Sequence, residues 1–196
     1  MAKGLFHGSP WDLGVSGGFA SPLTAELITA ADLVVGWGSS LNMWTMRHGK
    51  LIGPGARVAQ VDDDSSAIGA HQPVDIGVVG DVAQTARVVL ASLPAQPGYR
   101  SAELRARIAR EVRWRDVPYD DEGGDGVIDP RTLTIALDDL LPAERVVAID
   151  SGNFMGYPSM FLSVPAEPDR LVGLREAEPL LVRHRQEHAR VAHEIA

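Results

Sequence analysis

A glycine- and serine-rich turn is the first feature of this sequence that could do chemistry. The letters GWGSS at 36–40 close a short apolar run that begins at Asp32 and is typical of a buried strand. Glycines let a backbone approach a phosphate, and serine hydroxyls and backbone amides can donate to it. Asp62, at the end of a second predicted strand, could bond a ribose hydroxyl. Because Leu41 breaks the complete G-x-G-x-x-G pattern, a tight turn before an Asp-rich loop fits the residues as well. The candidate nucleotide contacts are Gly36, Gly38, Ser39, Ser40 and Asp62.

A second turn, DSGN at 150–153, ends another apolar strand predicted over 145–150. Loops at the carboxyl ends of parallel strands are where α/β proteins bind ligands. Ser151, Gly152 and Asn153 are therefore candidate binding residues. The alternative is a purely structural turn, since asparagine tolerates a left-handed backbone.

Two further patterns have plainer interpretations that we favour. The letters HRQEH at 184–188 would place two histidines on one face of a helix, as in a zinc site. No third ligand is apparent in the sequence. We therefore expect a polar helix face there. The arginines between 100 and 115 could bind an anion or nucleic acid. Acidic residues interrupt that run, so a solvated linker helix is expected.

Composition excludes several classes of protein. The 196 residues carry a formal net charge of −8, which argues against a free-standing nucleic-acid binder and weakly favours the cytoplasm. The absence of cysteine removes disulfides, thiolate nucleophiles and Cys-ligated metals. We find no secretory signal and no apolar run of the roughly 18 residues that a membrane span needs. We therefore expect a partner that is neither nucleic acid nor membrane.

The elements that must position these turns alternate between helix and strand. Ser21-Pro22 predicts a helix start, and Asp81 predicts a cap for a helix that runs through Leu93. Strands are predicted over 32–38, 57–62 and 74–79, and a second α/β unit begins near 129 with a helix over 131–141. Apolar strands separated by helices indicate a mostly parallel sheet covered on both faces. We predict an α/β fold of three layers, Rossmann-like and incomplete, followed by the first βα unit of a second α/β domain.

Seven stretches follow one another along the chain: AKGLF at 2–6, GVSGGFASP at 14–22, GWGSSLN at 36–42, VDDD at 61–64, VDIGVVGD at 74–81, IDPR at 128–131 and DSGNFM at 150–155. In this order and at this spacing they resemble thiamine-diphosphate-dependent enzymes of the acetolactate synthase and benzoylformate decarboxylase type. The resemblance covers roughly 2–165. It implies a partial central domain over 1–94, a linker with an Arg-rich helix over 95–128 and the start of the pyrophosphate-binding domain over 129–165. An atypical helical tail is expected over 166–196.

The resemblance implies a cofactor, a metal and a substrate class. In the complete family, thiamine diphosphate and Mg²⁺ act on a 2-oxo acid in decarboxylases and synthases, which are lyases or transferases. Ser151, Gly152 and Asn153 would face the cofactor's phosphates, and the central domain of some members binds FAD or ADP. The family's metal motif is Gly-Asp-Gly after a buried strand. Residues 124–126 match its letters but follow a linker-like stretch, so no metal site is expected there.

Three functional hypotheses follow. The first is a fragment of such an enzyme that is inactive alone. It would be without the domain that carries the activating glutamate and without the main metal motif. No residue is assigned a catalytic role. The second is a module that binds FAD, ADP or NAD without catalysis. The third is an interaction protein that has lost an enzyme's activity. For any of these we expect a homo-oligomer or a partner that supplies missing domains.

Overall fold

The computed structural model describes residues 3–94, 98–149, 152, 155–164 and 171–173, with side chains for all but the last three. The chain divides into two compact units, which are described separately: residues 13–112 form one, and residues 1–12 with 113–196 form the other. The elements of the first unit are η1 (Gly17–Phe19), α1 (Pro22–Thr29), β1 (Leu33–Trp37), α2 (Met43–Met46), β2 (Arg57–Asp62), β3 (Ile76–Val79), α3 (Val82–Ser92) and α4 (Ala102–Glu111). Those of the second are η2 (Trp114–Asp116), α5 (Pro130–Leu140), β4 (Val147–Ile149), α6 (Gly156–Phe161) and β5 (Leu171–Gly173).

Local signals set the helix starts. The Ser21 hydroxyl accepts from the backbone N–H of Thr24, and Pro22 occupies the first position of α1. The Asp81 carboxylate accepts from Gln84 N–H at the start of α3. Each cap satisfies one of the four N–H groups that a helix start leaves without a partner. The predicted starts of α1 and α3 are confirmed.

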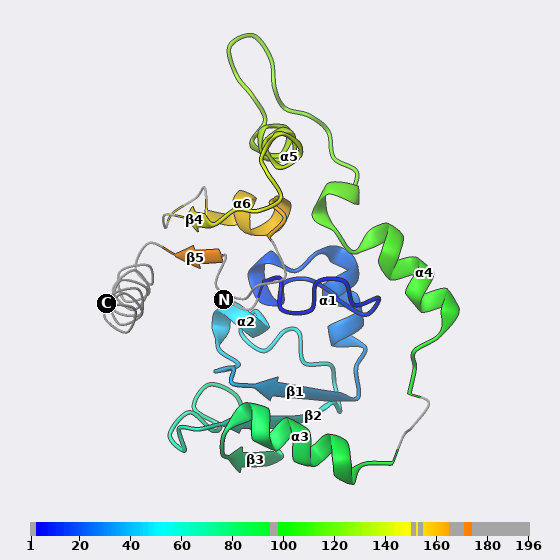
Figure 1. Ribbon diagram of the computed structural model, residues 1–196, viewed down its shortest axis with the longest axis vertical. Helices are drawn as coiled ribbons and strands as arrows, with labels where there is room; N and C mark the ends of the chain where they lie inside the picture. The colour runs from blue at the N-terminus through cyan, green and yellow to red at the C-terminus, as the bar shows by residue number, and fades with distance from the viewer. Residues whose placement is uncertain (1–2, 95–97, 150–151, 153–154, 165–170, 174–196) are drawn as a thin grey trace, which may run out of the picture. The chain divides into compact units, whose positions relative to one another are not determined.

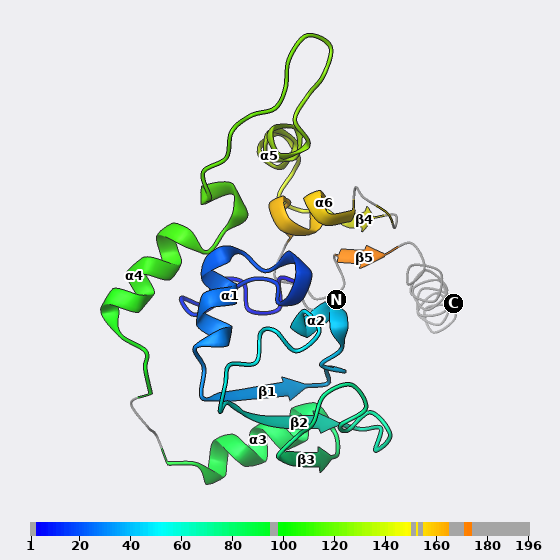
Figure 2. The same cartoon turned by 180° about the vertical axis from the view of Figure 1, so that it is seen from behind.

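The first unit is built on a parallel sheet with the strand order β1-β2-β3. Leu41, Met46, Leu51 and Val58 form its buried core, against which Ala25 and Ile28 of α1 also pack. Figures 1 and 2 show α3 crossing the sheet on one side. Helix, sheet and helix make the three layers expected from the sequence, in agreement with the Rossmann-like α/β fold.

The cover on the α3 side is thinner than the strand sequences predict. No residue of α3 is buried, and Leu33 of β1 and Ile76 of β3 remain 50% and 46% exposed. In the part of the chain that the structure describes, β1 pairs with β2 alone, so its outer edge is open. β1 also lacks the charged residues with which proteins usually protect an edge strand.

This edge leads to a prediction about association. We expect the chain to form dimers or larger species through β1, with the five-residue strands of two copies pairing antiparallel. Val35→Lys places a charge at the centre of that contact and should return the protein to a monomer in static light scattering. Val88→Lys, on the exposed side of α3, is the matched control and should leave the mass unchanged. Equal masses for the V35K variant and the parent would contradict the prediction.

The second unit is organised around α5 and a short parallel pair, β4 with β5. Asp129 caps α5, as its carboxylate accepts from the Arg131 N–H at 2.7 Å, and Pro130 follows at the first helical position. Ile149 and Val164 form a small apolar core, and the rings of Trp114 and Phe161 lie 6.1 Å apart between centroids. The predicted helix and strand of this unit are therefore present. The predicted helix over 166–196 lies outside the described residues.

The Asp129 cap predicts a defined acid sensitivity. The Arg131 side chain, then backbone donors from Glu122 and Arg131, hold the pKa of Asp129 well below its usual value of 3.8. A depressed carboxyl pKa stabilises the fold fully above the unfolded value and progressively less as the pH falls below it. Urea midpoints between pH 2.5 and pH 5 should therefore drop below about pH 4 in the parent chain. The decline should be shallower for Asp129→Asn, and parallel declines would contradict this assignment.

Candidate functional site

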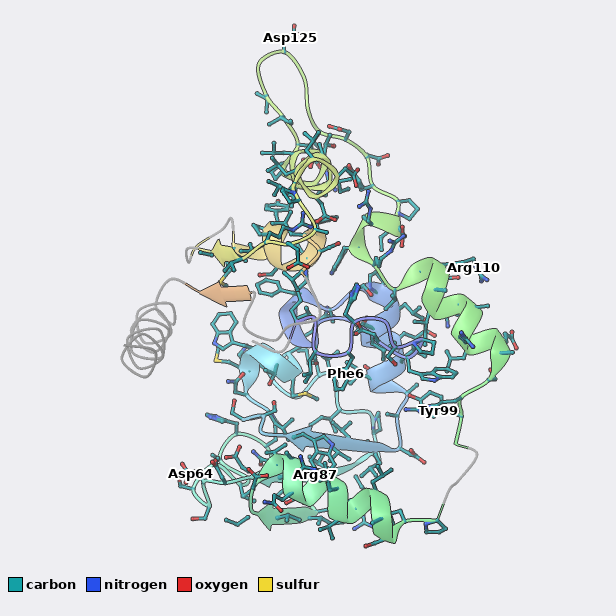
Figure 3. The ribbon with its side chains drawn as sticks, viewed as in Figure 1. Phe6, Asp64, Arg87, Tyr99, Arg110 and Asp125 are labelled. Carbon is teal, nitrogen blue, oxygen red and sulfur yellow. The ribbon has the colours of Figure 1, made fainter. Side chains whose placement is uncertain are left out.

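The candidate site lies at the carboxyl edge of the first unit's sheet, where the loops after β1 and β2 meet. A cavity of about 400 Å³ opens there, within the size range of small-ligand sites. Figure 3 places Asp64, in the loop after β2, at the end of the sheet toward which the strands point. The cavity is lined by Asn42, Met43, Trp44, His48, His71 and Gln72.

A strained turn after α2 supports His48 in this cavity. Arg47 and His48 have φ values of 48° and 56°, in the left-handed region that non-glycine residues rarely adopt. The Arg47 guanidinium fixes the turn because it donates to the carbonyls of Gly17 at 2.8 Å and Ala20 at 3.0 Å. Neither residue carried a signal that sequence reasoning could have used. Strain of this kind collects at functional sites, where the surrounding structure stabilises it.

The lining offers a flat aromatic surface beside polar side chains. The Trp44 indole is 68% exposed, and the lining contains no carboxylate that would repel an anion. Asn42 is already engaged, since its Oδ1 accepts from Trp44 and Thr45 N–H and its Nδ2 donates to Ser40. The imidazoles of His48 and His71 and the Gln72 amide remain for a ligand. This arrangement suits a planar ring with hydrogen-bonding groups.

The five nucleotide candidates from the sequence lie in or beside this loop system but do not line the cavity. Gly36 is buried in β1, where Leu41 packs against it. Gly38 has a φ of +58° and donates its N–H to Val61. Ser39 and Ser40 use their carbonyl and hydroxyl oxygens as acceptors within the protein. Asp62 Oδ1 accepts from Asp64 N–H at 3.1 Å, so it closes a turn. Their role in binding stays a prediction.

Gln60 is a residue that sequence reasoning missed. It lies in the central strand and is 1% exposed. Its Nε2 donates to the carbonyls of Ser39 and Ala67, both at 3.0 Å, and its Oε1 accepts from Gly69 N–H at 2.9 Å. One buried amide thus ties the loop after β1 to the loop after β2. A glutamine within an apolar strand was the available signal.

Removing this amide should loosen both loops together. Gln60→Leu leaves two carbonyls and one N–H without partners, at a cost of about 2 kcal/mol or more in unfolding free energy. Gln72→Leu is the matched control, because Gln72 lines the cavity and makes no hydrogen bond within the described residues. We expect urea unfolding to separate the two variants by most of that cost. Equal midpoints would show that Gln60 does not organise the loops.

The second candidate turn follows β4 in the other unit. Gly152 is exposed, has a φ of +112° and has open space where a Cβ would stand. Its carbonyl accepts from Met155 N–H at 3.2 Å, just before α6. Ser151 and Asn153 lie outside the described residues. The described part of this turn thus has an open backbone, and the binding role of the turn stays a prediction.

The weaker sequence patterns can also be placed. Asp125 lies at the tip of an exposed hairpin closed by Gly124 and Val127, as Figure 3 shows. No buried strand precedes it, so the 124–126 match lacks the context of a metal motif. On α4, Arg107 pairs with Glu26 at 2.6 Å and with Glu111, as expected of a solvated helix face. The histidines of 184–188 lie outside the described residues.

Comparison with known proteins identifies the fold of the first part of the chain. The family described as thiamine pyrophosphate enzyme, central domain, matches residues 1–89. These residues are a thiamine pyrophosphate enzyme central domain. The parallel sheet and the cavity at its carboxyl edge thus belong to the central domain of that family, and thiamine diphosphate is the cofactor that the family implies.

Relatives of known name extend the likeness beyond the central domain. Sulfoacetaldehyde acetyltransferases from Rhodobacter capsulatus and Roseovarius nubinhibens are each 32% identical over 170 residues, covering 76% of this chain and 29% and 28% of theirs. A probable sulfoacetaldehyde acetyltransferase from Rhizobium meliloti is 29% identical over 154 residues, covering 68% of this chain and 26% of its own. The chain thus spans less than a third of the length of the curated relatives that it matches.

The described residues fit the family's cofactor in one respect only. The open backbone at Gly152 could approach a diphosphate. For the family's metal ion the described residues show no comparable fit. They contain no group of three or more His, Asp or Glu side chains that could hold a metal ion. We therefore assign the metal no ligand. Within the same residues, no helix is long and apolar enough to cross a membrane.

Proposed function

We propose that this chain is the central domain and the opening of the pyrophosphate-binding domain of a thiamine-diphosphate-dependent enzyme. The central-domain match over residues 1–89 carries this proposal. The complete enzyme acts on a 2-oxo acid with thiamine diphosphate and Mg²⁺ and works as a decarboxylase or synthase. The names of the relatives favour the acyl-transferring branch.

The chain's own residues support the fold of the enzyme and face the phosphates of the cofactor. We assign Ser151, Gly152 and Asn153 to the cofactor's diphosphate, since they follow the carboxyl end of β4. When bound, the cofactor supplies the carbanion chemistry of 2-oxo acid cleavage. The purified chain should show no turnover, because it spans less than a third of the length of the relatives that it matches.

Two measurements test the proposal. Purified chain with thiamine diphosphate, Mg²⁺ and pyruvate should release no carbon dioxide above a protein-free blank, and with sulfoacetaldehyde added should form no acetyl product. Sequencing the transcript on both sides of the reading frame should reveal further family-like coding sequence. Turnover by the purified chain would contradict the claim of inactivity. A transcript without such sequence would contradict the claim that the chain is part of a longer enzyme.

The cavity supports a second candidate, a nucleotide-binding module that takes FAD, ADP or NAD. The exposed Trp44 indole beside the Gln72 amide suits an adenine ring. ADP should raise the melting temperature of the parent chain and not that of Trp44→Ala. Trp37→Ala is the matched control, since Trp37 is exposed on β1 and does not line the cavity. A shift with thiamine diphosphate and Mg²⁺ alone would favour the first proposal.

A further inference from the structure

Lys3 lies in an unusual setting in the unit that contains α5 and α6. Its side chain is half-buried, and its Nζ donates to the backbone carbonyl of Ser159 at 2.5 Å. Among the described residues no carboxylate lies within ion-pair distance of this ammonium. A half-buried lysine with a carbonyl as its acceptor is poorly compensated for the loss of water.

The charged groups that face Lys3 do not neutralise it. They are Asp12 on the N-terminal segment, Asp138 on α5 and Arg145 just before β4. Asp138 is already bonded to the Arg145 guanidinium and to the N–H and hydroxyl of Ser163. Burial is the main cause that lowers the pKa of Lys3 to about 8, and the positive charge of Arg145 adds to it. A substantial fraction of this amine is therefore neutral in mildly alkaline solution.

The residue whose carbonyl accepts from Lys3 also carries an unused hydroxyl. Ser159 is 1% exposed, and its Oγ has no hydrogen-bond partner within the described residues. Buried polar atoms are satisfied in the great majority of cases, so this hydroxyl has a hydrogen-bonding capacity that the described residues leave unused. Its own backbone carbonyl is the acceptor of Lys3. The acceptor of the amine and the unused hydroxyl thus belong to one residue of α6.

We propose that Lys3 is an acylation site of this chain, with small acyl thioesters as donors. The neutral Nζ attacks the thioester carbonyl carbon, the C–S bond breaks, and the amine's surplus proton leaves with the thiolate as free thiol. The products are an Nζ-acyl lysine and a thiol, with no change in oxidation state. The Ser159 hydroxyl donates to the acyl oxygen during the attack and in the product.

The product suits the site better than the ammonium does. An amide keeps one N–H, which retains the bond to the Ser159 carbonyl. Its oxygen gives the Ser159 hydroxyl the partner that it lacks. Acylation also removes a charge from a half-buried position where no carboxylate of the described residues lies within ion-pair distance. A short acyl group such as acetyl fits these requirements.

The sequence makes the test unusually clear, because Lys3 and Lys50 are its two lysines. The whole chain is incubated with acetyl-coenzyme A between pH 7 and pH 10. Acetylation is then measured by mass spectrometry of Asp-N peptides, with fragment ions that separate Lys3 from the Met1 amine. We expect Lys3 to react with a midpoint near pH 8. At pH 8 Lys3 should be acetylated about tenfold faster in the folded chain than in urea. The lowered pKa makes a larger fraction of the Lys3 amine neutral in the folded chain. This gain outweighs the weaker nucleophilicity of a less basic amine.

The Ser159→Ala variant distinguishes the effect of the hydroxyl on the acetylation rate from the effect of the burial of the Lys3 amine. The variant removes an unsatisfied polar atom, so it should fold at least as well as the parent chain. We expect Lys3 acetylation to slow several-fold with an unchanged pH midpoint, while Lys50 acetylation does not change. The proposal is overturned if Lys3 reacts no faster folded than in urea, or if Lys50 is acetylated first. Unchanged Lys3 kinetics in the S159A variant would remove the assigned role of the hydroxyl.

Discussion

Replacing Asp138 by alanine is expected to cost about 3–5 kcal/mol of unfolding free energy, because a charge network loses its buried anion. The Asp138 side chain is 4% exposed and pairs with both Arg145 and Arg115. It also accepts from the Ser163 N–H at 2.7 Å and the Ser163 hydroxyl at 2.9 Å. Without it the Arg145 guanidinium, which is 11% exposed, has no other ion-pair partner in the part of the chain that the structure describes. Urea unfolding followed by tryptophan fluorescence measures the loss, since Trp114 lies against Phe161 in this unit.

The neighbouring aspartate provides the control. Asp139 also pairs with Arg115, at 2.9 Å, but its side chain is 58% exposed. Exposed pairs contribute about 0–1 kcal/mol, so Asp139→Ala should change the midpoint little. If the two variants lose equal stability, charge burial is not what holds α5 in place.

The second large effect is expected at Gly17. Its φ is +81°, and an added Cβ would lie 1.8 Å from the Trp44 carbonyl oxygen and 2.8 Å from the Thr45 Cα. Both obstacles are backbone, so the segment before α1 would have to move away from α2. We expect Gly17→Ala to lose about 3 kcal/mol or more, from overpacking together with left-handed strain. Thermal and urea unfolding of the purified variant check this value.

A substitution at Gly14 separates the cost of left-handed backbone strain from the cost of overpacking. Its φ of +74° is similar, but a Cβ there would meet nothing within 4 Å. Gly14→Ala should therefore cost only the backbone strain, about 1–2 kcal/mol. A G17A variant no less stable than G14A would mean that the Gly17 backbone does not lie against Trp44 and Thr45. G17A should also weaken ligand binding at the cavity, because the Gly17 carbonyl is an acceptor for Arg47.

Local chemistry made much of the fold predictable. The caps at Ser21, Asp81 and Asp129 and the prolines after two of them determine where helices begin within a few residues of chain. The apolar runs likewise give strands, because a buried parallel strand needs side chains that pack on either side. The ordered stretches in the first part of the chain were sufficient to indicate the family that residues 1–89 belong to.

The sheet's thin cover was harder to predict. Leu33 and Ile76 read as core residues, since a periodic pattern shows that a strand is apolar but not what lies against it. Whether the α3 side is covered depends on elements elsewhere in the fold.

What the sequence by itself determined is thus the α/β class, the element starts and the family of residues 1–89. Only the tertiary structure decided that His48 and His71 line one cavity, that Gln60 ties two loops together, and that Lys3 meets Ser159 across 156 residues of chain. The physical reason is range. Capping and strand propensity act over a few neighbouring residues, whereas these contacts depend on strand register, loop paths and the burial of polar groups, which exist only in the folded chain.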